Sequence, residues 1–120
     1  VARRAPAAAD TAAQHLNAVT LVGRFSGSDP ERQLPSGDTI VAFRVVVDRP
    51  SRARAPGRST IDTIDCQAVS ASVRRAVARL HPGEVVDVRG SLRRRFFRGP
   101  GGVASRYGVE VAALHPIRSG

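Results

Sequence analysis

The sequence is poor in aromatic residues, at 4%, and it contains no tryptophan, no methionine and a single cysteine, Cys66. One cysteine cannot form an internal disulfide, and without a CxxC partner it predicts neither a zinc site nor a redox pair, so we expect a small core residue. No run of about 18 apolar residues is present, so we expect no membrane-spanning helix. The first six residues lack the apolar core of an export signal, which predicts a cytoplasmic protein.

Lysine is also absent, and all 19 residues of the Lys+Arg class are arginine. The formal net charge is +9 and the isoelectric point is about 11.7, values that favour a polyanionic partner. Nucleic acid is the leading candidate, although acidic membranes and acidic proteins also fit the charge alone. The guanidinium group binds phosphate in a bidentate manner and stacks on bases.

The length of 120 residues, 42% of them hydrophobic, predicts one domain with one core. Residues 1–14 are rich in Ala, Arg and Pro without apolar periodicity, so we expect a flexible basic arm. Residues 15–117 form the predicted domain and residues 118–120 the C-terminal end. Within the domain, residues 49–59 carry four arginines and two prolines, which predicts a flexible basic loop.

Alternation of apolar and polar residues predicts strands over 17–25, 39–48, 61–68 and 84–92, then a strand and its return between about 93 and 114. The return is expected at residues 98–102, which read Arg-Gly-Pro-Gly-Gly. Gly23 and Gly90 interrupt strands and offer places for sharp coiling. The side chains expected to face the core are Val19, Leu21, Phe25, Val41, Phe43, Val45, Val47, Ile64, Cys66, Ala68, Val86, Val88, Leu92, Val109 and Val111.

A helix is predicted to begin near Ser70 or Ser72, either of which can act as an N-cap, and to end at 81–83, His-Pro-Gly. The helix's expected core-facing positions are Val73, Ala76, Val77 and Leu80. Three strands, a helix and two further strands follow the order of an OB fold. The sequence therefore predicts an all-β protein, a five-stranded OB-fold barrel with one helix between strands 3 and 4.

Several segments resemble the bacterial single-stranded DNA-binding protein family in the family's own order. They are the opening strand 17–25 (NAVTLVGRF), Ile64-Asp-Cys, and the block from Gly83 to Phe97 that ends in Arg-Arg-Arg-Phe-Phe. The resemblance implies an OB-fold subunit of a homotetramer, with a homodimer as the alternative, that coats single-stranded DNA during replication, recombination and repair. It also implies a nucleoid-associated protein with no catalysis, no cofactor and no small-molecule substrate.

Two departures from the family concern its functional parts. The family's stacking aromatics on and beyond the third strand match Thr63 and Val69 here. The family commonly ends in a disordered tail with an acidic, aromatic-containing tip, whereas this sequence stops at residues 116–120, Pro-Ile-Arg-Ser-Gly. Either the tail is not part of this sequence or this paralogue lacks it.

Sequence-tolerant binding of a single strand needs cations for the backbone and aromatic faces for the bases. Without a bulge, alternation places Arg89, Arg93, Arg95 and Phe97 on one face, and Phe97 matches the family's stacking position on this hairpin. Phe96 points the other way and is expected to be structural, and for Tyr107 packing is favoured over stacking. The candidate nucleic-acid-binding residues are Arg24, Arg44, Arg52, Arg54, Arg58, Arg89, Arg93, Arg95, Phe97 and Tyr107.

No catalytic or metal site is predicted, because His15, His81 and His115 have no Cys, Asp or Glu at metal-ligand spacing. The glycines at 99–102 lack the G-K-[ST] ending of a phosphate loop. Two other functions stay open: an OB-fold scaffold or accessory protein with weak nucleic-acid binding, and RNA binding. The shortage of aromatics favours the scaffold, whereas the arginine-rich face opposes it.

Overall fold

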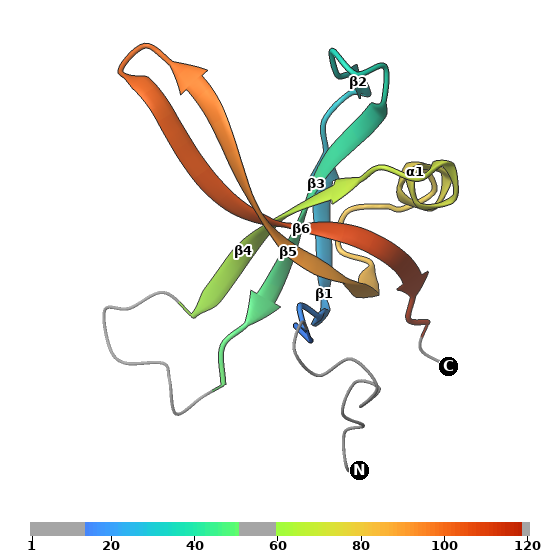
Figure 1. Ribbon diagram of the computed structural model, residues 1–120. Coiled ribbons are helices and arrows are strands. Elements are labelled where there is room, and N and C mark those ends of the chain that lie inside the picture. Colours follow the sequence, from blue (N-terminus) through green and yellow to red (C-terminus); the bar gives the residue numbers. More distant parts are fainter. Residues whose placement is uncertain (1–13, 51–59, 119–120) are drawn as a thin grey trace.

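The computed structural model describes residues 14–50 and 60–118. Its elements are β1 (Val19–Ser28), β2 (Arg32–Gln33), β3 (Thr39–Asp48), β4 (Ile61–Ala68), α1 (Ala71–Ala78), β5 (Val85–Gly99) and β6 (Gly102–Pro116) (Figure 1). Nearly all of the predicted arm, and the loop arginines Arg52, Arg54 and Arg58, lie outside the described residues.

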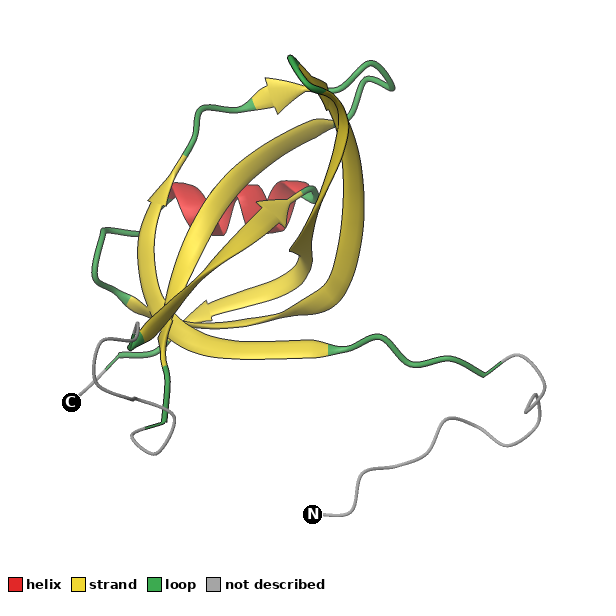
Figure 2. Ribbon diagram, turned by 90° about the vertical axis from the view of Figure 1, so that its left-hand side faces the viewer, coloured by secondary structure: helices red, strands yellow, loops and turns green. Residues whose placement is uncertain are grey.

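Five of the strands close into a barrel. β1 pairs with both β3 and β5, β5 pairs with β6, and β4 lies between β6 and β3. All these pairings are antiparallel except β4 with β6, and the two-residue β2 adds to β3 outside the barrel. Figure 2 shows the closed barrel, with α1 behind its strands in this view. The predicted all-β OB-fold barrel, with its helix between the third and fourth barrel strands, is confirmed.

The core is built from the inward faces of the five barrel strands. Phe43, Val45, Cys66, Val86 and Val88 are fully buried, and the Phe25 and Phe43 ring centroids lie 6.2 Å apart. Every side chain predicted to face the core is buried or packed against it, with the exception of Leu92. Successive side chains of a strand point to opposite faces, so the alternation of apolar and polar residues identifies the buried face. The predicted core residues are confirmed for that reason.

The helix and the single cysteine behave as their sequence signals predict. The Ser70 hydroxyl accepts a hydrogen bond from the Val73 amide at 3.3 Å, which caps α1, and Val73 and Val77 are buried beneath it. Burial raises the pKa of the Cys66 thiol to about 12. The thiol therefore stays protonated at neutral pH and serves as a small apolar core group.

Glycines and bulges allow the barrel to close. A side chain at Gly23 would collide with the Val46 carbonyl oxygen, and one at Gly90 would collide with the Glu110 carbonyl oxygen. The register slips between Phe25 and Gly27 in β1, and between β5 and β6 at Gly90. Both glycines therefore stand where two backbones approach closely, as the sequence predicted for coiling.

The hairpin of β5 and β6 differs from the prediction. The segments predicted as separate strands, 84–92 and from 93 onward, form the single strand β5, which pairs with β6 up to Gly99–Gly102. Leu92, predicted to face the core, is 44% exposed. The β1–β5 ladder ends at Val19 and Gly90, and beyond it only the Asn17 side chain hydrogen-bonds the Leu92 backbone. Leu92 therefore pairs only with Val109 of β6 in the described residues and has no β1 residue on its other side to help cover its side chain.

Candidate nucleic-acid interface

A groove of about 560 Å³ runs over the outer surface of β3 and β4. Because Phe43 and Cys66 point into the core, their neighbours Ala42, Arg44, Asp65 and Gln67 point outward and form the floor of the groove. The segment from Asp29 to Ile40 borders the groove on one side and the β5–β6 hairpin borders it on the other. Figure 1 shows the hairpin and β2 projecting from the barrel on the two sides of this surface.

The pleat of the hairpin gives it two different faces. Glu110 pairs in register with Gln67 of the floor, so it points outward with Gln67. Alternation from Glu110 then assigns to the same side the residues that we call the groove face: Arg93, Arg95, Phe97 and Arg106. The opposite side, which we call the reverse face, carries Leu92, Arg94, Phe96, Arg98 and Tyr107.

Phe97 presents a ring that a base can reach. The side chain is 44% exposed, and the Arg106 guanidinium carbon lies 5.4 Å from the ring centroid. This cation–π contact holds the ring and leaves its remaining surface open. The predicted alternation along β5 holds only if β5 has no bulge. A bulge does occur between β5 and β6, but the extra residue, Ala112, belongs to β6. The alternation along β5 is therefore uninterrupted, and Arg93, Arg95 and Phe97 share a face as predicted.

Carboxylates accompany the arginines around the groove. Arg44 Nη2 lies 3.1 Å from Asp29 Oδ1, and Arg106 Nη1 lies 4.0 Å from Asp65 Oδ2. Glu110 Oε1 lies 3.3 Å from Arg93 Nε and 3.9 Å from Arg95 Nη2. Such exposed pairs contribute only about 0–1 kcal/mol each, so a phosphate can replace the carboxylate, but each pair lowers the positive charge that the groove offers.

The structure brings some of the predicted binding residues together and separates others. Arg44, Arg95, Phe97 and Tyr107 line the groove, and Arg93 adjoins it through Glu110. Arg24 and Arg89 lie elsewhere on the barrel, where they pair with Asp48 at 3.4 Å and Asp87 at 3.1 Å. Sequence reasoning missed three arginines that also line the groove: Arg32, Arg98 and Arg106. Alternation along the return strand could have found Arg106, since it precedes Tyr107.

The aromatic side chains of the hairpin are more exposed than the sequence suggested. Tyr107, for which packing was favoured, is 58% exposed, and Phe96, expected to be structural, is 65% exposed. Both lie on the side of the sheet that faces the core, but beyond the point where the hairpin leaves the barrel, so nothing in residues 14–50 and 60–118 covers them. The positions on and just beyond β4 that match the family's aromatics give no ring, because Thr63 and Val69 occupy them. The exposed aromatic rings of the described residues therefore all lie on the hairpin.

The described residues also bear on a metal site and on a membrane-spanning helix. Residues 14–50 and 60–118 contain no group of three His, Cys, Asp or Glu side chains placed to hold a metal ion. In the same ranges no helix is long and apolar enough to cross a membrane.

Outside the groove, Arg49 donates hydrogen bonds of 3.1 and 2.8 Å to Asp62 and lowers the pKa of that carboxyl, which ties the end of β3 to the start of β4.

Comparisons with known proteins identify the family and the fold of the chain. A single-stranded DNA-binding protein of Oceanobacillus iheyensis is 31% identical over 98 residues, which cover 82% of this chain and 60% of that relative. The chain thus spans about 60% of the relative's length. The solved structure of a Plasmodium falciparum SSB in complex with ssDNA matches with a TM-score of 0.72 at 20% identity, over 88% of this chain and 97% of that one, and supports the fold. The model of the single-strand binding protein family matches residues 16–115, and the chain belongs to this family.

Proposed function

We propose that this protein binds and coats single-stranded DNA along the groove, without strong sequence preference, in replication, recombination and repair. The observation that carries the proposal is the groove face, where an accessible aromatic ring, Phe97, stands beside Arg95 and Arg106. A base can stack on the ring while the guanidinium groups contact the backbone phosphates. The family and the relatives that it includes support this assignment.

The remaining expectations for the protein follow from this proposal. Residues 15–117 act as the binding domain, with 1–14 as a basic arm that can touch phosphates. The protein acts by binding, without catalysis, and we place it in the cytoplasm at the nucleoid. The family resemblance favours a homotetramer, with a homodimer as the alternative, and light scattering of the purified chain decides between them.

One observation favours a different function. Carboxylates partner Arg44, Arg95 and Arg106, and the floor lacks aromatic rings, so the groove is weaker for nucleic acid than its arginine count suggests. An OB-fold scaffold that binds a protein partner would tolerate both features. The two functions differ in ligand preference, because a coating protein prefers single strands to duplex and a scaffold has no such preference.

A fluorescence-anisotropy titration over several salt concentrations tests the proposal, with a labelled strand of about 30 nucleotides, its duplex and the RNA strand of the same sequence. If about five arginines contact phosphates, log K should fall with log salt at a slope near −3.5, which is about −0.7 per phosphate. Preference for the DNA single strand that persists at high salt supports coating. Weak binding to all three ligands that is lost for all of them as the salt concentration rises supports the scaffold. Tighter binding of the RNA strand than of the DNA strand indicates an RNA-binding protein.

Replacing Glu110 with glutamine is expected to strengthen binding of the single strand about two- to fivefold at moderate salt. Glu110 is the carboxylate partner of both Arg93 and Arg95, and its loss frees two guanidinium groups for phosphate. The salt dependence should also become steeper, because more phosphates are neutralised by arginine. Anisotropy titrations at several salt concentrations measure both quantities.

Asp38→Asn is the matched control for Glu110→Gln. It changes the net charge by the same amount, but Asp38 hydrogen-bonds Ser36 and forms no ion pair with an arginine in the described part of the chain. Equal gains from the two variants would mean that only the overall charge matters and that the Glu110 pairs do not restrain the groove.

A further inference from the structure

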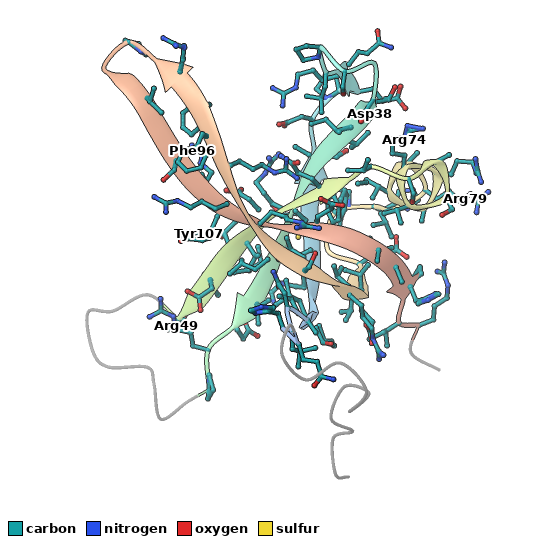
Figure 3. The ribbon with its side chains drawn as sticks, viewed as in Figure 1. Asp38, Arg49, Arg74, Arg79, Phe96 and Tyr107 are labelled. Atoms are coloured by element: carbon teal, nitrogen blue, oxygen red, sulfur yellow. The ribbon has the colours of Figure 1, made fainter. Side chains whose placement is uncertain are left out.

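The reverse face of the hairpin carries an organised set of aromatic and cationic groups. The Arg94 guanidinium carbon lies 5.0 Å from the Phe96 ring centroid and 5.6 Å from that of Tyr107. Arg94 Nε and Nη2 both lie 3.3 Å from Ser105 Oγ, which fixes the guanidinium between the two rings. The rings themselves are more than half exposed. Figure 3 shows Phe96 and Tyr107 on the hairpin, clear of α1.

The charge on this face differs from that of the groove face. Arg93, Arg95 and Arg106 each have a carboxylate within 4.0 Å. Residues 14–50 and 60–118 contain no carboxylate at ion-pair distance from Arg94, whose partners are neutral. The reverse face therefore presents rings beside a cation whose charge is not neutralised, which suits an anionic ligand with flat apolar parts.

The reverse face is also continuous with the groove. Phe96, Arg98 and Tyr107 border the groove together with Phe97, although the pleat points the side chains of neighbouring residues to opposite sides of the hairpin. A nucleic-acid strand that stacks one base on Phe97 can continue over the hairpin to the reverse face, and rings and arginines line the whole of this path. Exposed Leu92 and Val103 extend the apolar part of this path.

We propose that the reverse face is a second stacking site for the same single strand, in which bases stack on Tyr107 and Phe96 while Arg94 contacts a phosphate. The inference rests on the proposed function, since it concerns the continuation of a strand bound in the groove. It makes the hairpin a two-sided element, with Phe97 serving the groove and Tyr107 serving the longer path. A short strand held on the floor and on Phe97 does not need to stack on Tyr107, because the pleat points the Tyr107 side chain to the other side of the hairpin.

The composition of the chain supplies a direct reporter. Tyr107 is the sole tyrosine and tryptophan is absent, so the tyrosine emission of the protein comes from the reverse face alone. A stacked base quenches this emission. Titration with a strand of about 30 nucleotides should lower Tyr107 emission at the midpoint seen by anisotropy, whereas a strand of about eight nucleotides should bind without lowering it. Tyr107→Trp allows excitation where nucleic acid does not absorb and should report the same loss.

Variants of Tyr107 separate stacking from a structural role. Tyr107→Ala should weaken binding of the longer strand roughly tenfold and that of the short strand far less, because only the longer strand loses a stacking surface. Tyr107→Phe keeps the ring face and should bind both strands as the unchanged protein does. Equal thermal stability of the two variants shows that the alanine substitution acts on binding.

The outcomes distinguish this inference from the proposed function. If the unchanged protein binds neither strand, the proposed function fails. If it binds both, and the longer strand neither quenches Tyr107 nor requires it, the second site is absent while the groove stands. If Tyr107→Ala instead lowers the mass measured by light scattering and leaves both affinities unchanged, the reverse face is a contact between copies of the chain and the inference is wrong.

Discussion

Phe97→Ala is expected to weaken binding of a strand of about eight nucleotides roughly five- to 150-fold, which corresponds to the loss of about 1–3 kcal/mol from one base–aromatic stack. Phe97 is the accessible ring on the groove face, and the floor beneath it supplies no other ring within the described residues. Removing it leaves a groove floor that offers guanidinium groups, three of them paired with carboxylates, and no ring. Anisotropy titration with a labelled short strand measures the change.

Phe96→Ala is the matched control, because it removes the same ring from the adjacent position of β5 on the opposite face of the hairpin. With a short strand it should have little effect. Both side chains are exposed, at 44% and 65%, so neither substitution empties the core and the two melting temperatures should agree. Equal losses from both variants, or no loss from either, would remove the stacking assignment of Phe97.

The sequence predicted the face of Phe97 because a strand alternates strictly, and the bulge that threatened this reasoning falls on the partner strand. The same alternation misjudged Leu92 and Tyr107. Alternation states which side of a sheet a residue faces but not how far the core extends along that side. On the hairpin the core side continues past the last covering strand, so apolar residues there are exposed.

The electrostatics of the groove could not be predicted from local patterns. Glu110 pairs with Arg93, and Asp65 with Arg106, across separations that only the β5–β6 and β4–β6 registers define. A net charge of +9 describes the whole chain and does not reveal that three of the five arginines lining the groove have carboxylate partners. The sequence therefore identified a partner class and overstated the positive charge of the site.

The fold was more accessible because its signals are local. The bounds predicted for β3 and β4 are those observed, and Ser70 caps α1 as expected. Gly23 and Gly90 were identified as places for coiling. What the sequence could not give is the partner that each glycine meets, since Val46 and Glu110 are brought there by barrel closure.

Gly90→Ala is expected to destabilise the fold by about 3 kcal/mol or more, which lowers the melting temperature by roughly 10 °C or more for a domain of this size. The new Cβ would collide with the Glu110 carbonyl oxygen and lie 2.9 Å from its carbon and 3.0 Å from Val111 Cα. These are backbone atoms of a paired strand, so they cannot move aside without breaking the ladder. Thermal unfolding followed by circular dichroism measures the loss.

Gly101→Ala provides the comparison, because its new Cβ would meet nothing within 4 Å and the residue does not require a positive φ. Its stability should stay within about 0.5 kcal/mol of the unchanged protein. If Gly90→Ala and Gly101→Ala have the same melting temperature, β5 and β6 do not approach each other closely at Gly90. Because the Glu110 carboxylate pairs with Arg93 and Arg95, that result would also contradict the geometry of the groove face, so barrel closure and the proposed binding both depend on where Glu110 lies.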